Sequence, residues 1–381
     1  TNGAAGTPGA KGATGATGAS GAQYGRQLVA ATSIDTTGDV GAYTSTAIGA
    51  DGLAIISYYD ITSANLKVAH CDNTACTTAT TSIIDDSTGN LAATTSITIG
   101  TDGLAIISYR DLANGDLKVA HCDNTVCTTA ATSTIDSTGS ILSMSITIGT
   151  DGLAIISYAE VNNKVLKVAH CDNTTCSTAS ASTIDTNAHT GMYTSITIGT
   201  DGLAIISSYD YTNWDLKVAH CDNIACTTAT TSTIDTGGDV GMYTSITIGT
   251  DGLAMISYQD QTHHNLKVAH CDNTTCSTAT TSTLDTGVGA WDTSIAIGAD
   301  GLAIISYWDS TYRHLKLAHC DTTCSTATTR AIDSFGDIGR YTSTAIGADA
   351  LPIISYYDNT NGDLKVAHVM HTAWAPHGWG R

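Results

Sequence analysis

Paired cysteines are the residues whose types and spacing most directly suggest chemistry in this chain. The 12 cysteines form six local pairs: Cys71 and Cys76, Cys122 and Cys127, Cys171 and Cys176, Cys221 and Cys226, Cys271 and Cys276, and Cys320 and Cys324. A histidine precedes the first cysteine of each pair, so zinc binding is one interpretation. The pairs lack a second Cys-x-x-Cys knuckle, and haem attachment would need Cys-x-x-Cys-His. We therefore expect six short-range disulfides, which are typical of an oxidising, extracellular or cell-surface setting.

Lysine, histidine and aspartate also recur in register along the chain. Lys-(Val/Leu)-Ala-His appears repeatedly, from Lys67 and His70 to Lys365 and His368. An enzyme needs one asymmetric constellation, so these equal copies predict structural hydrogen bonds between repeats. An acidic residue opens a turn in each repeat, at Asp60, Asp111, Glu160, Asp210, Asp260, Asp309 and Asp358. Such a residue commonly accepts hydrogen bonds from the backbone N–H groups that follow it.

Metal and cofactor binding have little support in these patterns. A calcium site needs several oxygens around one ion, and the sequence lacks Asp-x-Asp-x-Asp-Gly. We therefore predict no cofactor, with calcium as the remaining alternative.

Aromatic and cationic residues break the regularity of the repeats. The candidate ligand or partner surface consists of Tyr211, Trp214, His263, His264, Trp291, Trp308, Tyr312, Arg313, His314 and Tyr341. Tyr243 and Arg340 lie in nearby connecting loops. Side chains of these types suit either stacking on sugars or a protein interface rich in Tyr, Trp and Arg. Both interpretations remain open from the sequence, as does simple surface variation without a binding role.

An internal repeat must position these residues. The step Asp-(Gly/Ala)-Leu recurs at Asp51, Asp102, Asp151, Asp201, Asp251, Asp300 and Asp349, about every 50 residues. Within one copy, TSITIG and a LAIIS-type run flank a Gly-Thr-Asp-Gly turn, and LKVAHC and TTSTID supply two more strands. No ten-residue segment carries a helical apolar stripe. Four antiparallel strands repeated seven times predict an all-β, seven-bladed β-propeller over residues 24–368, with a linear β-solenoid as the structural alternative.

The first and last repeats predict how the ring closes. Residues 29–35 (VAATSID) align with the fourth strand at 229–235, but no three strands precede them. The last copy stops after its third strand at 364–368. We expect the N-terminal strand to complete the last blade, which removes exposed sheet edges. Antiparallel alternation should place the second-to-third turns and the fourth-to-first connections on one face, and the Asp-Gly turns and disulfide loops on the other.

The two chain ends lie outside the repeats. Residues 3–23 read as uninterrupted Gly-X-Y triplets, so 1–23 is predicted to be collagen-like, with a flexible linker as the alternative. The segment 369–381 is rich in Trp and His, and Trp374, His377 and Trp379 make it a candidate docking tail. The chain begins with Thr1, which indicates a processed or truncated start. We predict self-association, as a homotrimer through the Gly-X-Y segment, a head-to-tail polymer, or both.

Charge and catalytic motifs restrict the function classes. The formal net charge of −20 disfavours nucleic acid and anionic membrane surfaces as partners. No apolar run is long enough to span a membrane. The chain lacks Gly-x-Ser-x-Gly, His-Glu-x-x-His, a phosphate loop and the sialidase Asp box, and Glu160 is its only glutamate. Because these motifs are missing, we expect no catalytic residues. A hydrolase would require a deep polar pocket at the propeller axis with a perturbed carboxylate.

The repeat string (I/A)G-(A/T)-DG-L-(A/P)-(I/M)-ISY, followed by DLKVAHC, resembles the tandem repeats of secreted or surface-anchored bacterial propeller proteins over residues 27–368. The Gly-X-Y segment is similar to the collagen-like stalks of bacterial surface fibres and phage fibres. Together these features predict a non-enzymatic extracellular structural protein, a subunit of a surface fibre or filament. The alternative is a trimeric carbohydrate-binding adhesin that uses Trp214, His264, Trp308 and Tyr312. A propeller hydrolase is the third interpretation.

Overall fold

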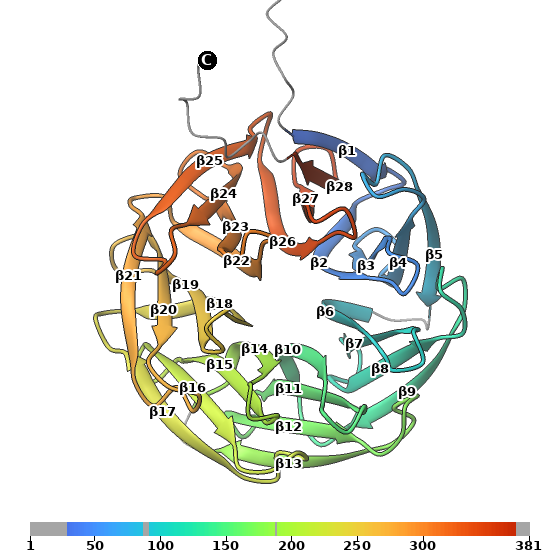
Figure 1. The fold of residues 1–381 in the computed structure, drawn as a ribbon. Helices are drawn as coiled ribbons and strands as arrows, with labels where there is room; N and C mark the ends of the chain where they lie inside the picture. The colour runs from blue at the N-terminus through green and yellow to red at the C-terminus, as the bar shows by residue number, and fades with distance from the viewer. Residues whose placement is uncertain (1–28, 87–90, 187–188, 371–381) are drawn as a thin grey trace, which may run out of the picture.

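Seven four-stranded antiparallel sheets are arranged as blades around a central axis (Figure 1). This computed structural model describes residues 29–86, 91–186 and 189–370. It confirms the predicted all-β, seven-bladed propeller with four strands in each blade. The described residues contain no helix that is long and apolar enough to cross a membrane. Segment 1–23 and most of the predicted tail, with Trp374, His377 and Trp379, lie outside the described residues.

Each blade runs from an innermost strand beside the axis to an outermost strand at the perimeter (Figure 1). The innermost strands are β2 (Val40–Ile48), β6 (Leu91–Ile99), β10 (Ile141–Ile148), β14 (Met192–Ile198), β18 (Val240–Ile248), β22 (Ala290–Ile297) and β26 (Ile338–Ile346). The second strands are β3 (Ala54–Asp60), β7 (Ala105–Asp111), β11 (Ala154–Glu160), β15 (Ala204–Asp210), β19 (Ala254–Asp260), β23 (Ala303–Asp309) and β27 (Pro352–Asp358). We number the blades one to seven in this order.

The third and fourth strands complete each sheet. The third strands are β4 (Asn65–Cys71), β8 (Leu117–Cys122), β12 (Val165–Cys171), β16 (Asp215–Cys221), β20 (Asn265–Cys271), β24 (His314–Cys320) and β28 (Asp363–Val369). The outermost strands are β5 (Ala79–Asp85), β9 (Ala130–Asp136), β13 (Ala179–Asp185), β17 (Ala229–Asp235), β21 (Ala279–Asp285), β25 (Ala327–Asp333) and, for blade seven, β1 (Val29–Asp35). The second strands are almost entirely buried between neighbouring blades. The outermost strands contain both exposed and partly buried residues.

The N-terminal strand closes the ring as predicted. Strand β1 pairs antiparallel with β28, and Val29 lies opposite Val369. Strand β28 therefore extends one residue past the predicted end of the propeller at residue 368. Val369 is buried, and it occupies the position at which the other third strands have a cysteine.

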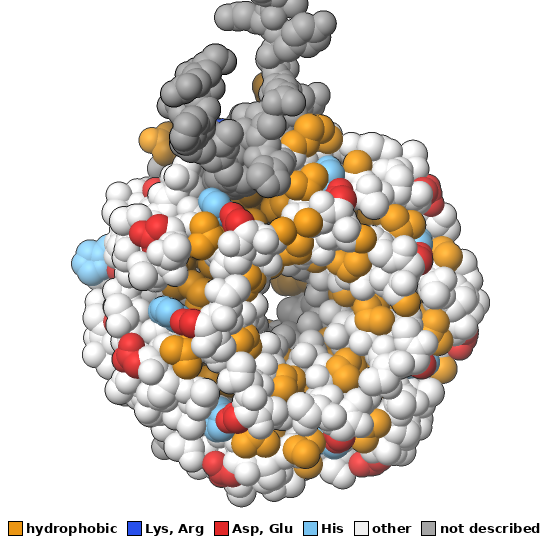
Figure 2. All heavy atoms as spheres, in the orientation of Figure 1, with side chains coloured by type: hydrophobic (Ala, Val, Ile, Leu, Met, Phe, Trp, Pro, Cys, Tyr) orange, Lys and Arg blue, Asp and Glu red, His pale blue; other side chains and the backbone are white. Residues whose placement is uncertain are grey.

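The predicted distribution of the connections over the two faces is confirmed by hydrogen bonds. The N–H of Val240, after a fourth-to-first connection, donates to the carbonyl of Trp214 in a second-to-third turn at 2.9 Å. At the opposite face, the Thr150 hydroxyl donates to the carbonyl of Gly202 in the Asp-Gly turn of the next blade at 3.2 Å. Figure 2 shows an opening at the axis, and histidine and acidic side chains lie next to one another at intervals around it.

The recurring lysines join neighbouring blades. Each lysine forms an ion pair with the aspartate that ends the outermost strand of the preceding blade. The pairs are Lys67–Asp35, Lys118–Asp85, Lys167–Asp136, Lys217–Asp185, Lys267–Asp235, Lys316–Asp285 and Lys365–Asp333. In six blades a buried tyrosine of the second strand donates to the same carboxylate, as Tyr58 does to Asp35 at 2.7 Å. Blade four has Ser208 in place of this tyrosine.

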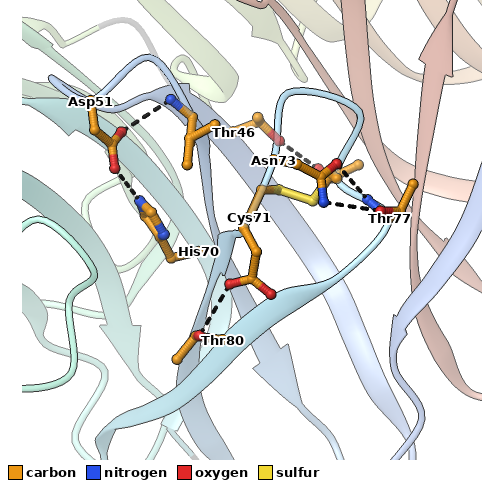
Figure 3. The surroundings of a disulfide bond; sticks show 11 residues. Thr46, Asp51, His70, Cys71, Asn73, Thr77 and Thr80 are labelled. Carbon is orange, nitrogen blue, oxygen red and sulfur yellow. Dashed lines mark hydrogen bonds and ion pairs between the residues drawn. A yellow bond between two sulfur atoms is a disulfide. The ribbon is translucent and has the colours of Figure 1, made fainter.

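The recurring histidines contact an aspartate of their own blade. Our expectation that they form hydrogen bonds between blades is therefore wrong. His70 Nε2 lies 2.9 Å from Oδ2 of Asp51, in the Asp-Gly turn of the same blade (Figure 3). The difference arises from alternation along the strand. Lys67 and His70 are three residues apart on β4, so their side chains leave opposite faces of the sheet.

All six predicted disulfides are present, and no cysteine is free among the described residues. The bridges join Cys71 to Cys76, Cys122 to Cys127, Cys171 to Cys176, Cys221 to Cys226, Cys271 to Cys276, and Cys320 to Cys324. Because every one of these thiols is bridged, the alternative zinc interpretation of the cysteines is wrong.

Each bridge closes the loop that follows a third strand. The second cysteine of the pair has a left-handed backbone, with φ between 48° and 56°, at Cys76, Cys127, Cys176, Cys226, Cys276 and Cys324. This conformation reverses the chain within a few residues, and the Cα atoms of the first pair are only 4.9 Å apart. In the same loop the Asn73 amide donates to the hydroxyl of Thr77 at 2.9 Å (Figure 3). The sequence spacing showed which cysteines pair, but it did not indicate this backbone conformation.

The turn-opening acids have the structural role that we expected. The N–H of Thr212 donates to the Asp210 carboxylate at 2.9 Å, and that of Asn162 donates to Glu160 at 2.8 Å. These residues therefore stabilise the second-to-third turns.

Candidate functional site: an aromatic cavity at the axis

The innermost strands are irregular near their first residues, and the side chains at this point line the central axis. Aligning the repeats places one residue of each blade at the same position: Tyr43, Thr94, Ser143, Tyr193, Tyr243, Asp292 and Tyr341. We call these residues the axial ring. The pairing register between first and second strands shifts here, for instance between Met192 and Ser195. Five ring residues have φ between 52° and 54°: Tyr43, Tyr193, Tyr243, Asp292 and Tyr341. This left-handed backbone is uncommon for residues other than glycine, and such strain is often found at functional sites.

The axial ring lines a cavity of about 400 Å³. The other residues that line it are Arg110, Leu142, Met192, Trp291, Trp308 and Arg340. They come from the starts of innermost strands and the ends of second strands. The cavity therefore lies toward the face that carries the second-to-third turns, opposite the disulfide loops.

A second layer of side chains, one residue further along each innermost strand, lies next to the axial ring and forms hydrogen bonds to its backbone. A space of about 210 Å³ is lined by the axial ring together with Thr44, Thr95, Met144, Thr194, Thr244, Thr293 and Thr342. The Thr95 hydroxyl donates to the carbonyl of Tyr43 in the preceding blade at 2.9 Å. Thr293 and Thr44 bond in the same way to the carbonyls of Tyr243 and Tyr341, each at 2.7 Å. These bonds between blades fix the backbone from which the ring side chains project.

Aromatic side chains form one wall of the cavity. The ring centroids of Tyr193 and Tyr243 are 4.4 Å apart, and Trp291 stacks on Tyr243 at 5.3 Å. Trp308 meets the edge of Trp291 at 5.8 Å. Tyr341 and Tyr43 form another pair at 4.2 Å. The aromatic wall therefore spans blades four to seven and blade one.

Blades two and three form the opposite wall, and its side chains are of a different kind. They contribute Thr94, Arg110, Leu142 and Ser143. The cavity is thus asymmetric although the fold repeats, with flat aromatic surfaces on one side and an arginine, two hydroxyl side chains and a leucine on the other.

Asp292 is the only acidic residue among the described residues that line the cavity. The N–H of Tyr341 donates to its Oδ2 at 2.8 Å. Withdrawal from water raises the pKa of Asp292 to about 6, although the Tyr341 N–H and the charge of Arg340 oppose this shift. Burial also raises the pKa of Tyr193 and of Tyr243, so both phenols stay protonated at neutral pH.

The two arginines of the cavity differ in their partners. The guanidinium of Arg340 lies 4.2 Å from the centre of the Trp308 ring, and its Nη2 is 3.2 Å from Oδ2 of Asp337. Arg110 Nη2 donates to the Ser140 hydroxyl at 3.1 Å, and its buried Nε has no hydrogen-bond partner among the described residues. Partial burial lowers the pKa of Arg110.

The structure divides the predicted surface into two groups. Trp291, Trp308 and Tyr341 line the axial cavity. The remaining residues lie on or beside the second-to-third turns of blades four to six: Tyr211, Trp214, His263, His264, Tyr312, Arg313 and His314. Trp308 is only 5% exposed, whereas Trp214 and Tyr312 are 55% and 67% exposed. The four residues of the proposed adhesin surface therefore do not share one environment.

The predicted disulfide residues do not belong to this site. None of the bridged cysteines is among the described residues that line the axial cavity. The loops that hold Cys127, Cys176, Cys276 and Cys324 follow third strands, at the face opposite the cavity. The disulfide loops therefore lie apart from the axial cavity.

The sequence did not identify eight of the residues that line the cavity: Tyr43, Thr94, Arg110, Leu142, Ser143, Met192, Tyr193 and Asp292. An alignment of the seven repeats would have identified the ring residues, because their position varies between copies. Asp292 stands where four other copies have tyrosine, two residues before the serine of the innermost strand. Arg110 stands where blade six has Trp308.

Comparisons with known proteins show the fold alone. No family model matches the chain, and no curated protein matches it. A protein of unknown function from Dyadobacter fermentans superposes with a TM-score of 0.57 at 11% identity, covering 90% of this chain and 99% of its own. The Dos1 propeller has a TM-score of 0.54 at 12% identity, with 87% and 77% covered. The periplasmic gluconolactonase of Pseudomonas aeruginosa has a TM-score of 0.53 at 9% identity, with 77% and 86% covered. The chain thus has a propeller fold that proteins of different functions share.

Proposed function

We propose that this protein is a secreted, non-enzymatic carbohydrate-binding propeller that holds a saccharide in its axial cavity. The observation that carries the proposal is the aromatic wall that faces small polar residues across a cavity of about 400 Å³. This volume lies within the range of ligand pockets, which are mostly apolar with a few placed polar groups. A sugar ring has C–H faces that can pack against the aromatic wall of the cavity. Its hydroxyls can bond to the Thr94 and Ser143 side chains.

Binding is a better match to the cavity than glycoside hydrolysis. A glycosidase commonly uses two carboxyl groups about 5–9.5 Å apart. Asp292 is the single acid in the described lining. Hydrolysis is nevertheless the second candidate, because Asp292 is a carboxylate with a raised pKa at the axis, the feature that we required of a hydrolase. Turnover of chromogenic glycosides that stops in Asp292→Asn would favour the hydrolase.

Location and assembly form separate parts of the proposal. Six disulfides suggest an oxidising, extracellular environment. We further propose that the segments 1–23 and 369–381 join copies into a fibre, a filament or a trimer. Such an assembly would present several cavities together and raise the avidity for a repetitive glycan.

A binding measurement with two tryptophan variants tests the carbohydrate proposal. The intact chain is screened on a glycan array, and the hits are titrated in solution. Trp291→Ala should weaken binding at least about tenfold, because it removes part of the aromatic wall. Trp214→Ala, on an exposed turn, should leave the affinity unchanged. Loss of binding in Trp214→Ala alone would move the site to the turns, and silence on the array would contradict carbohydrate binding.

A further inference from the structure

We infer that the saccharide bound in the axial cavity is acidic, and that Arg110 binds its carboxylate. This inference rests on the proposed function and specifies its ligand class. Arg110 lines the cavity on the side of blades two and three, opposite the aromatic wall. A sugar ring lying on that wall can direct a carboxylate toward the guanidinium.

Arg110 is an exception within the repeat. In every blade the residue at this position lies opposite a leucine of the third strand, as Arg110 lies opposite Leu117. The equivalent residues are uncharged: Tyr59, Ala159, Tyr209, Gln259, Trp308 and Tyr357. The arginine is therefore not needed to build a blade.

Arg110 also differs in its partners from the recurring lysines and from Arg340, the other arginine of the cavity. Each of the recurring lysines has an aspartate, and Arg340 has Asp337. Arg110 forms no ion pair with any described residue, although the chain has a formal net charge of −20. Its Nη2 donates a hydrogen bond to the Ser140 hydroxyl, and its Nε is buried without a partner among the described residues.

A carboxylate is the ligand group that matches this arrangement. Partial burial costs the guanidinium solvation, which an anion entering the cavity can restore. The planar fork of an arginine matches the two oxygens of a carboxylate, and such charge-assisted bonds are stronger than neutral ones. Uronic acids combine this group with a sugar ring that can stack on the Tyr and Trp side chains.

Asp292 lines the same cavity and opposes an anionic ligand when it is ionised. Its surroundings are the Tyr341 N–H, Arg340 and the phenols of Tyr193, Tyr243 and Tyr341. The pKa of Asp292 is raised to about 6, so the carboxyl is largely neutral at pH 5. A sugar carboxyl with an ordinary carboxylic-acid pKa of about 4 is still mostly ionised there. An acidic saccharide should therefore bind more tightly at pH 5 than at pH 7.5.

Matched ligands test the inference on the unaltered chain. Tryptophan fluorescence or calorimetry would compare an oligogalacturonide with its methyl ester, and methyl glucuronide with methyl glucoside. We expect the acids to bind at least about tenfold more tightly than their neutral counterparts. Equal binding of acid and ester would overturn the inference and leave the proposed function standing. Binding of neither class, with no change in tryptophan fluorescence, would contradict the proposed function itself.

Arginine variants then assign the preference to one side chain. Arg110→Gln should bind acid and ester equally, and Arg110→Lys should retain part of the preference. Arg313→Gln, on an exposed turn of blade six, is the control and should behave like the unaltered chain. A preference that survives in Arg110→Gln would overturn the role of Arg110. Thermal unfolding of each variant checks that it folds, and the acid–ester comparison on the unaltered chain does not depend on any variant.

Discussion

Nζ of Lys118 in blade two lies 2.6 Å from Oδ2 of Asp85, the last residue of the outermost strand of blade one. The hydroxyl of Tyr109 donates to the same carboxylate at 2.5 Å. Equivalent lysine–aspartate contacts occur at all seven blade boundaries, including the one closed by β1. A polar contact therefore supplements apolar packing wherever two blades meet.

Lys118→Met should destabilise the propeller by about 3 kcal/mol, because the buried Asp85 carboxylate loses its cationic partner. The double variant Lys118→Met/Asp85→Leu should recover part of this loss, since it removes the charge as well. Urea unfolding measures both free energies. Lys164→Met, at an exposed turn, is the control, and a loss no larger than in this control would show that the contact contributes little.

Acid should weaken the same contacts. Burial alone would raise the pKa of Asp136, but hydrogen bonds from Lys167, Thr138 and Tyr158 outweigh it and lower the pKa to about 2. Because the folded pKa lies below the unfolded value of 3.8, this stabilisation is present above pH 3.8 and is lost as the pH falls toward 2. Thermal unfolding across this range should show a steep loss of stability that is smaller in Asp136→Asn. A variant with an unchanged slope would contradict the assignment.

Asp292 should have the opposite effect on stability. Its folded pKa of about 6 lies above the unfolded value of 3.8, so ionisation is unfavourable in the folded state. Stability from this group should fall as the pH rises from 3.8 to 6 and should stay low above it. Asp292→Asn should therefore raise the free energy of unfolding at pH 7.5 by up to about 3 kcal/mol, but hardly at pH 3.5. An equal effect at both pH values would show that packing, and not charge, is responsible.

Each disulfide should contribute modestly and locally. Replacing Cys221 and Cys226 by serine removes a bridge across a sequence separation of 5 residues. The chain-entropy model gives a loss of about 2 kcal/mol for so small a loop. Blade seven has Val369 at this position and forms its sheet without a bridge, so the variant should still fold. Circular dichroism and thermal unfolding check this, and complete loss of strand content would show that the bridges are required for folding.

Assembly should depend on the chain ends and not on the propeller. Deleting residues 370–381, or separately 1–23, should leave the fold and sugar binding intact while lowering the mass measured by light scattering. Light scattering with negative-stain imaging of the full chain provides the reference. A full chain that is monomeric, or a deletion that leaves the assembly unchanged, would remove that segment from the mechanism.

Most of the fold could be predicted because its determinants are local or periodic. The strand runs, the Asp-Gly turns and the cysteine spacing each act within about 50 residues, and repetition reveals the blade number. The way in which the ring closes could also be predicted, because residues 29–35 match the fourth strand of the other repeats. The placement of His70 was predicted wrongly. A repeated residue indicates a structural role without indicating which face of the blade it serves.

The sequence by itself therefore determined the seven blades, their closure and their disulfides. Only the tertiary structure decided the axial site, because Tyr43, Tyr193, Asp292 and Tyr341 come together solely through closure of the ring. Closure also surrounds Asp292 with neighbouring blades, which raises its pKa, and it brings Arg110 to the same cavity. Solvation and the distances between charges depend on all the surrounding blades, so no single repeat could reveal them.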